Sequence, residues 1–201
     1  MTTLASSIAE HGSLASYDPD ARLEEVARFL GQVLDENALD AALIGGHAVN
    51  FWETPRFTED FDFTVAANPS AIQRIVERLQ AEGWEIEHRQ HPGGPSGPDF
   101  IRMQNPQTRD MLDIQAAKTD YQYLLIRRAV REPGQPFPVA TREDLIVLKL
   151  IAWRPIDQQD VLRLGKRQID WEYVAYWCET WGVTDKLTWL QRTLAEDAAD
   201  S

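Results

Sequence analysis

The sequence predicts an α+β fold, in which a mixed β-sheet flanked by helices is followed by a C-terminal helical bundle. Two observations support this prediction. Short apolar strands alternate with amphipathic helices over the first two thirds of the chain, and only helical patterns follow residue 141. The 201 residues, with a hydrophobic content of 43%, suffice for one domain or for one domain with a small helical appendage.

The N-terminal part is expected to alternate helices and strands. A polar tail over residues 1–16 precedes a helix over 19–37, whose leucines and valines form one stripe. A second long helix begins at Pro69, which suits the first turn of a helix, and stops before Gly83. The expected strands are 41–44, 60–65, 84–88, 100–104 and 110–116, with a short helix over 47–52 between the first two.

The C-terminal part is expected to be helical. The chain becomes helical from Tyr121, breaks at the proline-rich residues 132–138 and resumes at Thr141, which with the acids after it is typical of a capped helix start. The expected helices are 141–153, 158–165, 170–181 and 184–195. We therefore divide the chain into the tail 1–16, a sheet-containing domain 17–138 and a helical region 139–201.

A glycine pair, Gly45 and Gly46, follows the first expected strand. Glycine permits positive φ and a close approach of the backbone to a ligand. The helix expected after the pair would offer unpaired N–H groups and a partial positive charge at its N-terminus. We interpret the pair as a phosphate-binding turn, whereas the same residues taken alone would indicate only a bend.

Two acids, Asp60 and Asp62, alternate with Phe61 and Phe63 in the second expected strand. Residues two apart in a strand project from the same face, so the acids converge while the aromatic rings are buried on the other side. Carboxylates held together in this way repel each other unless a cation lies between them. A metal-binding strand beside a phosphate-binding turn predicts a nucleoside triphosphate bound with Mg²⁺.

These features resemble the motif of the polymerase-beta-like nucleotidyltransferases, in which a glycine pair is followed by Asp-x-Asp flanked by apolar residues. The pair at 45–46 and the acids at 60 and 62 match it, with thirteen residues between them. The pattern Gly-Gly-His-Ala-Val…Pro-Arg-x-Thr-x-Asp-x-Asp is most similar to the branch that includes AbiEii and AbiGii toxins of bacterial toxin–antitoxin and abortive-infection systems. The resemblance is close over residues 40–65 and looser to residue 165.

The resemblance implies a third carboxylate on a later strand. Asp113 is the candidate, because apolar residues frame it in a strand pattern. Asp99 and Asp110 are less suitable because each lies at the edge of a turn. The resemblance therefore implies that Asp60, Asp62 and Asp113 would be both the catalytic residues and the ligands of two Mg²⁺ ions, within a catalytic domain over 17–138.

Three further residues are expected to contact the nucleotide. Lys149 interrupts a helix that is otherwise apolar on every face, and a buried lysine needs an anion. An internal acid or the triphosphate would supply that charge, and the resemblance favours the phosphates. His47 either contacts a phosphate or caps the helix start. Arg56 either reaches the triphosphate or lies on the surface.

A segment resembling Arg-x-Lys-Asp-x-x-Asp follows this helix, with Ile156 in place of the lysine. Asp157 and Asp160 are three residues apart and share a helix face, so we expect them to pair with Lys149 or Arg154. The missing lysine leaves direct phosphate or base contacts from this segment in doubt.

The charge of the chain bears on the acceptor. A net charge of −12 argues against general nucleic-acid affinity. Residues 102–167 nevertheless carry twelve Lys or Arg against eight Asp or Glu, which indicates either an RNA-docking surface or solvated helix faces. RNA bound there would be released steeply as salt rises.

Other features bear on compartment and surface. The single cysteine, Cys178, is expected to pack in the core, and no apolar run or basic start indicates a membrane span or a signal peptide, so we expect a cytoplasmic protein. The aromatic residues of 171–181 are expected in the core or in a subunit interface rather than in a base-stacking platform. The Gly- and Pro-rich residues 91–98 form either a mobile hairpin loop or a lid.

The predicted activity is therefore Mg²⁺-dependent transfer of a nucleoside monophosphate from a nucleoside triphosphate to an acceptor hydroxyl, with release of pyrophosphate. A transfer RNA end, a protein hydroxyl and a small molecule such as an antibiotic all remain candidate acceptors. The resemblance adds a toxin role with a cognate antitoxin as partner. The alternative is an inactive protein of this fold that binds a nucleotide or another protein.

Overall fold

The computed structural model describes residues 19–90 and 100–199, so the predictions for 1–16 and 91–98 lie outside the described residues. A five-stranded mixed sheet has the order β1-β2-β5-β4-β3. β2 and β5 run parallel, and the other neighbouring strands are antiparallel. The strands are β1 (Asp40–Ile44), β2 (Asp60–Ala66), β3 (Glu85–Gln90), β4 (Phe100–Gln104) and β5 (Met111–Ala116).

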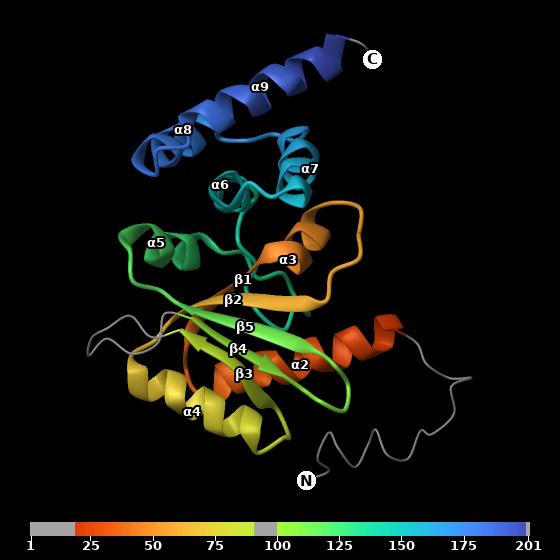
Figure 1. The fold of residues 1–201 in the computed structure, drawn as a ribbon, viewed down its shortest axis with the longest axis vertical. Helices are drawn as coiled ribbons and strands as arrows, with labels where there is room; N and C mark the ends of the chain where they lie inside the picture. Colours follow the sequence, from red (N-terminus) through yellow and green to blue (C-terminus); the bar gives the residue numbers. More distant parts are fainter. Residues whose placement is uncertain (1–18, 91–99, 200–201) are drawn as a thin grey trace.

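Helices cover both faces of this sheet (Figure 1). α2 (Pro19–Glu36) and α4 (Pro69–Gln80) lie on one face, and α3 (Gly45–Trp52) and α5 (Asp120–Arg128) lie on the other. The chain then forms α6 (Arg142–Ala152), α7 (Pro155–Gly165), α8 (Trp171–Thr180) and α9 (Thr184–Ala199), which extend away from the sheet. The predicted α+β fold with C-terminal helices is confirmed.

Local sequence accounts for where these elements begin and end. Asn68 caps α4 by accepting a hydrogen bond from the Ala71 N–H, Pro69 occupies the first turn, and Gly83 has φ +87° in the turn that follows the helix. α3 begins at Gly45, earlier than the expected residue 47, so the glycine pair forms its first turn. α7 begins at Pro155 rather than at 158.

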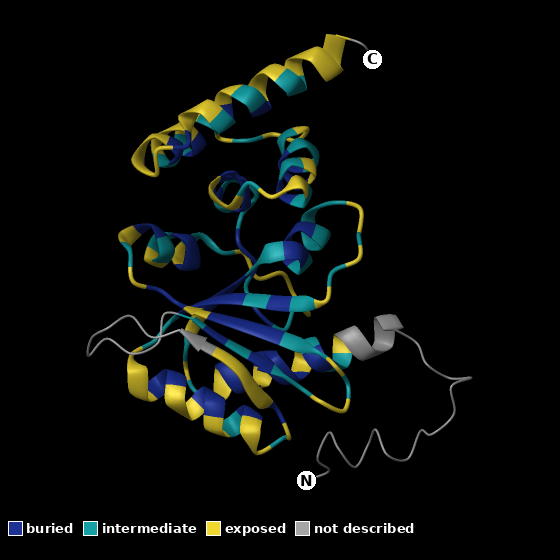
Figure 2. Ribbon diagram, viewed as in Figure 1, coloured by how far each residue is buried: buried dark blue, intermediate teal, exposed yellow. Residues whose placement is uncertain are grey.

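The core lies on both sides of the sheet, whose central strands are mostly buried, whereas α9 is mostly exposed (Figure 2). Phe61 and Phe63 are buried, as the alternation in β2 predicts. Cys178 is fully buried, which confirms its packing role, and burial raises the pKa of its thiol to about 11. Trp171 and Trp177 are half-buried and pack against the core. Each described helix is too short or too polar to cross a bilayer.

The buried carboxylate of Asp144 ties the C-terminal helices to the sheet layer. It accepts hydrogen bonds from the hydroxyl groups of Tyr173 on α8, at 2.6 Å, and of Thr141, at 2.7 Å. Arg128 at the end of α5 donates to it at 3.3 Å. Thr141 also caps α6 as predicted, by accepting from the Asp144 N–H. This cluster fixes α6 above the sheet, where the helix carries Lys149.

Candidate active site

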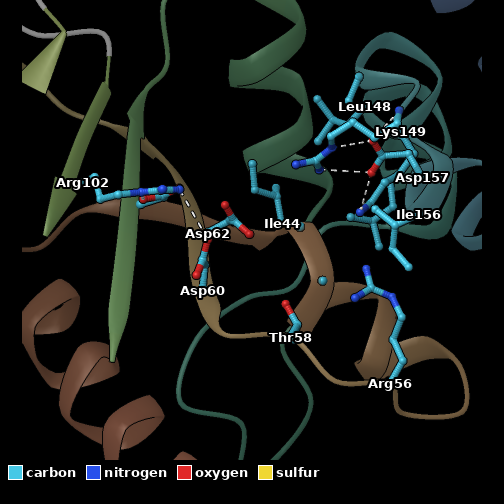
Figure 3. A pocket seen from close by; sticks show the side chains of 16 residues that line it. Ile44, Arg56, Thr58, Asp60, Asp62, Arg102, Leu148, Lys149, Ile156 and Asp157 are labelled. Atoms are coloured by element: carbon cyan, nitrogen blue, oxygen red, sulfur yellow. Dashed lines mark hydrogen bonds and ion pairs between the residues drawn. The ribbon is translucent and has the colours of Figure 1, made fainter. Parts of the chain in front are cut away.

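A pocket of about 340 Å³ opens between the sheet and the first two C-terminal helices (Figure 3). Strands β2, β4 and β5 provide one wall and helices α6 and α7 provide the other, with the start of α3 between them. The pocket therefore draws on both the sheet-containing and the helical parts of the chain. Its charged lining residues are Arg56, Asp60, Asp62, Arg102, Asp113, Lys149, Arg154 and Asp157.

The sheet wall brings together the three predicted carboxylates. Asp62 and Asp113 are direct partners in the parallel pairing of β2 with β5, so their side chains lie next to each other on one face. Asp60 lies two residues before Asp62 and projects from the same face. The structure thus places all three acids in one pocket.

Arg102 completes this row and is not among the site residues that the sequence predicts. It is the antiparallel partner of Asp113 across β4 and β5. Its Nε donates to Asp113 Oδ1 at 2.7 Å and its Nη2 to Asp113 Oδ2 at 2.5 Å, while Nη2 also lies 3.3 Å from Asp60 Oδ2. The buried apolar neighbours Ile101 and Met103 indicate that the side chain of residue 102 lies on the opposite face of the sheet. Only the pairing register of β4 with β5 shows that this side chain lies beside Asp113.

Asp62 has the most perturbed carboxyl group of the site. Burial, and then the charges of Asp113 and Asp60, raise its pKa to about 7. Within the part of the chain that the structure describes, its carboxylate makes no hydrogen bond or ion pair, unlike Asp113. Burial also raises the pKa of Asp60, against the opposing effect of Arg102. A cation beside Asp62 would therefore stabilise the site.

Replacing Asp62 by asparagine should stabilise the protein increasingly as pH rises. The pKa of Asp62 is raised from 3.8 to about 7, so between these values the folded chain binds more protons than the unfolded chain and stability falls as pH rises. Relative to wild type, the free energy of unfolding of Asp62→Asn should gain about 2–4 kcal/mol between about pH 4 and 8. Urea unfolding at both pH values without divalent cations tests this, with the exposed Asp185→Asn as control; a pH-independent difference would contradict it.

The glycine pair lies against the acids. A Cβ at Gly45, where φ is +69°, would lie 1.9 Å from Asp62 Oδ2, and one at Gly46 would lie 2.4 Å from Thr58 Oγ1. Both positions therefore require glycine. The pairing of Ile44 with Asp62 across β1 and β2 produces this approach. The first turn of α3, whose N–H groups have no carbonyl partner within the helix and no side-chain cap from Ile44, thus lies at the pocket beside the carboxylates.

The helical wall is a network of ion pairs around two acids that are fully buried, Asp157 and Asp160. Lys149 Nζ lies 3.0 Å from Asp157 Oδ1 and 2.9 Å from Asp160 Oδ2. Arg154 pairs with Asp157 at 2.7 Å, and Arg56 pairs with Asp160 through two hydrogen bonds of 2.8 and 2.6 Å. The predicted pairing of these acids with Lys149 and Arg154 is confirmed.

This network keeps both its acids ionised. Burial alone would raise the pKa of Asp157, but hydrogen bonds from Arg154 and Lys149 lower it below its usual value. The pKa of Asp160 is lowered in the same way by Arg56 and Lys149, also against burial. Arg163 lies 3.7 Å from Asp160 as well, so four cations on two anions leave a net positive charge on this wall. Lys149 therefore has its internal acid partners and also lines the pocket.

His47 does not line the pocket. Its ring stacks on that of Phe61, with 4.2 Å between the centroids. Phe61 points to the opposite face of β2 from Asp60 and Asp62, so the His47 ring lies away from these acids. Burial, and then the charge of Arg56, lower the pKa of His47 to about 4, so the ring is neutral at neutral pH. Its Nε2 has no hydrogen-bond partner among the described residues. A phosphate contact by His47 stays a prediction that this geometry does not support.

Comparisons with known proteins relate the chain to a family and to solved structures. The family model of the nucleotidyl transferase AbiEii toxin, type IV toxin–antitoxin system, matches residues 28–167. Among solved structures, the antibiotic-resistance factor ANT(2'')-Ia is 15% identical with a TM-score of 0.50, and the alignment covers 91% of this chain and 96% of that chain. The Megavirus polyadenylate synthase is 10% identical with a TM-score of 0.53, over 77% of this chain and 34% of that chain.

An antigenic nucleotidyltransferase-like protein from Paracoccidioides brasiliensis is 18% identical over 71% of this chain and 74% of that chain, with a TM-score of 0.47. No curated protein sequence matches the chain. At 15% and 10% identity, the likeness to the antibiotic-resistance factor and to the polyadenylate synthase shows that the chain shares their fold. Because the family match extends over well more than half of the residues, the chain belongs to the AbiEii family of nucleotidyltransferases.

Proposed function

We propose that this nucleotidyltransferase moves a nucleoside monophosphate from a nucleoside triphosphate to an acceptor hydroxyl with divalent-metal assistance, releasing pyrophosphate. The proposal is carried by one observation: two walls of opposite charge line the same pocket. The acids of β2 and β5 lie on one wall, and Lys149 and its arginine neighbours lie on the other. Such a site complements a metal-bound triphosphate, whose cation needs carboxylates and whose oxygens need cationic donors.

The acids fit a divalent cation. Asp60 and Asp62 project together, and Asp62 is partly buried without a hydrogen-bond or ion-pair partner in the described chain, so its charge lacks direct compensation. Asp113 would join them once Arg102 releases it, although no ready-made cluster of three metal-ligating side chains occurs in the described ranges. When bound, Mg²⁺ would neutralise charge that develops on the reacting phosphate.

The remaining residues bind and orient the substrate. The N–H groups at the start of α3 would hold phosphate oxygens, and Lys149, Arg56 and Arg154 would balance the charge of the triphosphate. Their ion pairs with Asp157 and Asp160 hold these cations in place before substrate arrives. Asp113 is the proposed acceptor of the proton from the attacking hydroxyl. Catalysis then depends mainly on position and electrostatics.

The basic stretch 102–167 supports RNA docking only weakly. At least nine of its twelve Lys and Arg residues form ion pairs within the chain, which leaves little net charge free to neutralise RNA phosphates. We therefore favour a small molecule or a short, specific RNA end as acceptor. The description of the matched family supports a toxin role with a cognate antitoxin.

A labelling experiment tests the proposal. Purified protein is incubated with each α-³²P-labelled nucleoside triphosphate, Mg²⁺ and total cellular extract, and label is resolved on RNA, protein and small molecules. We expect label in one of these fractions, released pyrophosphate and loss of both products in excess EDTA. Bound triphosphate with no label in any fraction would instead favour a non-catalytic binding protein, the second candidate, which the ion pair of Arg102 with Asp113 supports.

A further inference from the structure

The guanidinium of Arg102 lies among the carboxylates that the proposed function assigns to a divalent cation. It donates to both oxygens of Asp113 and lies 3.3 Å from one oxygen of Asp60. We propose that Arg102 is an internal counter-cation that holds the site closed to free metal and is displaced by the metal–triphosphate complex. The inference rests on the proposed function and adds a residue that controls when metal enters.

Arg102 and a metal ion compete for the same oxygen atoms. A carboxylate with both oxygens in a bidentate ion pair has lost its best-placed lone pairs to N–H donors. A divalent cation that binds Asp113 must take one of these oxygens, and its charge then repels the guanidinium at close range. Simultaneous full occupancy by Arg102 and metal is therefore unfavourable.

The surroundings of Arg102 allow it to leave. Its side chain is 33% exposed, whereas that of Asp113 is only 8% exposed, so the arginine can move toward solvent while the acid stays in the sheet. The ring of Phe100, two residues earlier on β4, lies 5.9 Å from the guanidinium carbon and offers a neighbouring surface for the displaced cation. The exchange requires a rotamer change without movement of the strand.

The competition couples metal binding to nucleotide binding. Free metal must displace Arg102 unaided. A metal–triphosphate complex also brings phosphate oxygens, which bind the cations of the opposite wall. The same oxygens can accept hydrogen bonds from the guanidinium after it has left Asp113. The protein should therefore bind divalent cations weakly without nucleotide. Removing Arg102 should strengthen binding of the metal alone.

Mn²⁺ binding in the absence of nucleotide tests the inference, with free Mn²⁺ measured by electron paramagnetic resonance. We expect Arg102→Met to bind Mn²⁺ about tenfold more tightly than wild type, a factor that corresponds to about 1.4 kcal/mol. Arg102→Lys keeps the charge but loses the bidentate geometry, and it should be intermediate. Arg74→Gln, which removes one positive charge from the exposed face of α4, should bind like wild type. Circular dichroism checks that each variant is folded. If Arg102→Met does not fold, the Mn²⁺ affinity of Arg102→Lys tests the inference.

The same titration with a non-hydrolysable triphosphate analogue separates this inference from the proposed function. If the wild type binds Mn²⁺ with the analogue but neither Arg102 variant binds free Mn²⁺ more tightly than wild type, the role of Arg102 is overturned and the metal-assisted function stands. If Arg74→Gln shows the same gain as Arg102→Met, net charge explains the effect and the role of Arg102 is again overturned. Absence of Mn²⁺ binding in every variant, even with the analogue, overturns both.

Discussion

Replacing Asp60 and Asp62 together by asparagine should lower nucleotidyl transfer by about 10³-fold or more, because several kcal/mol of charge stabilisation in the transition state would be lost. Folding should survive, since both side chains line the pocket rather than fill the core, and asparagine at 62 removes a partly buried charge that has no direct partner. Transfer is measured as labelled acceptor formed per unit time, and folding by circular dichroism and urea unfolding.

A double variant of matched charge provides the control. Glu172→Gln with Glu179→Gln removes two exposed acids from α8 and should leave transfer unchanged. Undiminished transfer by the Asp60→Asn/Asp62→Asn protein would exclude these acids as the metal site. Equal loss in the α8 variant would attribute the effect to net charge instead.

Replacing Lys149 by methionine should lower the free energy of unfolding by about 2–4 kcal/mol, near the range for breaking a buried ion pair. The substitution leaves Asp157 and Asp160, both fully buried, without their shared cation. Arg154 and Arg56 still pair with them, which keeps the loss below that of an isolated buried charge. Urea unfolding measures the change, and triphosphate binding should weaken in the same variant.

Lys166→Met is the matched control, because that lysine forms an ion pair with Asp197 in which both side chains are about half-exposed. Its loss should change stability by less than about 1 kcal/mol. A Lys149→Met protein as stable as wild type that no longer binds the triphosphate would mean that the ion pairs contribute little and that the lysine serves the phosphates alone. Adding Asp157→Asn to Lys149→Met should restore part of the lost stability.

Local periodicity predicts the elements that form the pocket, but pairing register decides which residues share it. Alternation in β2 places Asp60 and Asp62 on one face, and the same argument identifies Asp113 as an acid within a strand. Arg102 has an equally regular alternation around it. Its contact with Asp113 depends on how β4 is aligned on β5, which no short stretch of sequence specifies.

Three-dimensional packing also explains the outcome for the predicted phosphate contacts of His47 and Lys149. His47 follows the glycine pair directly in the sequence, and this position suggests a phosphate contact. In the structure, the first turn of α3 directs its ring onto Phe61 instead. For Lys149 the sequence shows that a buried anion is needed and leaves its identity open. The acids at 157 and 160 approach it because α7 packs against α6, a tertiary contact.

The contact of Gly45 with Asp62 is set by the ladder between β1 and β2, where Ile44 pairs with Asp62. The connecting residues 53–59 do not set it. Doubling the length of such a connection costs only about 0.6 kcal/mol in chain entropy. Insertions there should thus be tolerated if Arg56 keeps its contact with Asp160 and Glu53 keeps its ion pairs with Arg142 and Arg167. The alignment of β1 on β2, rather than the number of residues between the glycines and the acids, therefore defines this site.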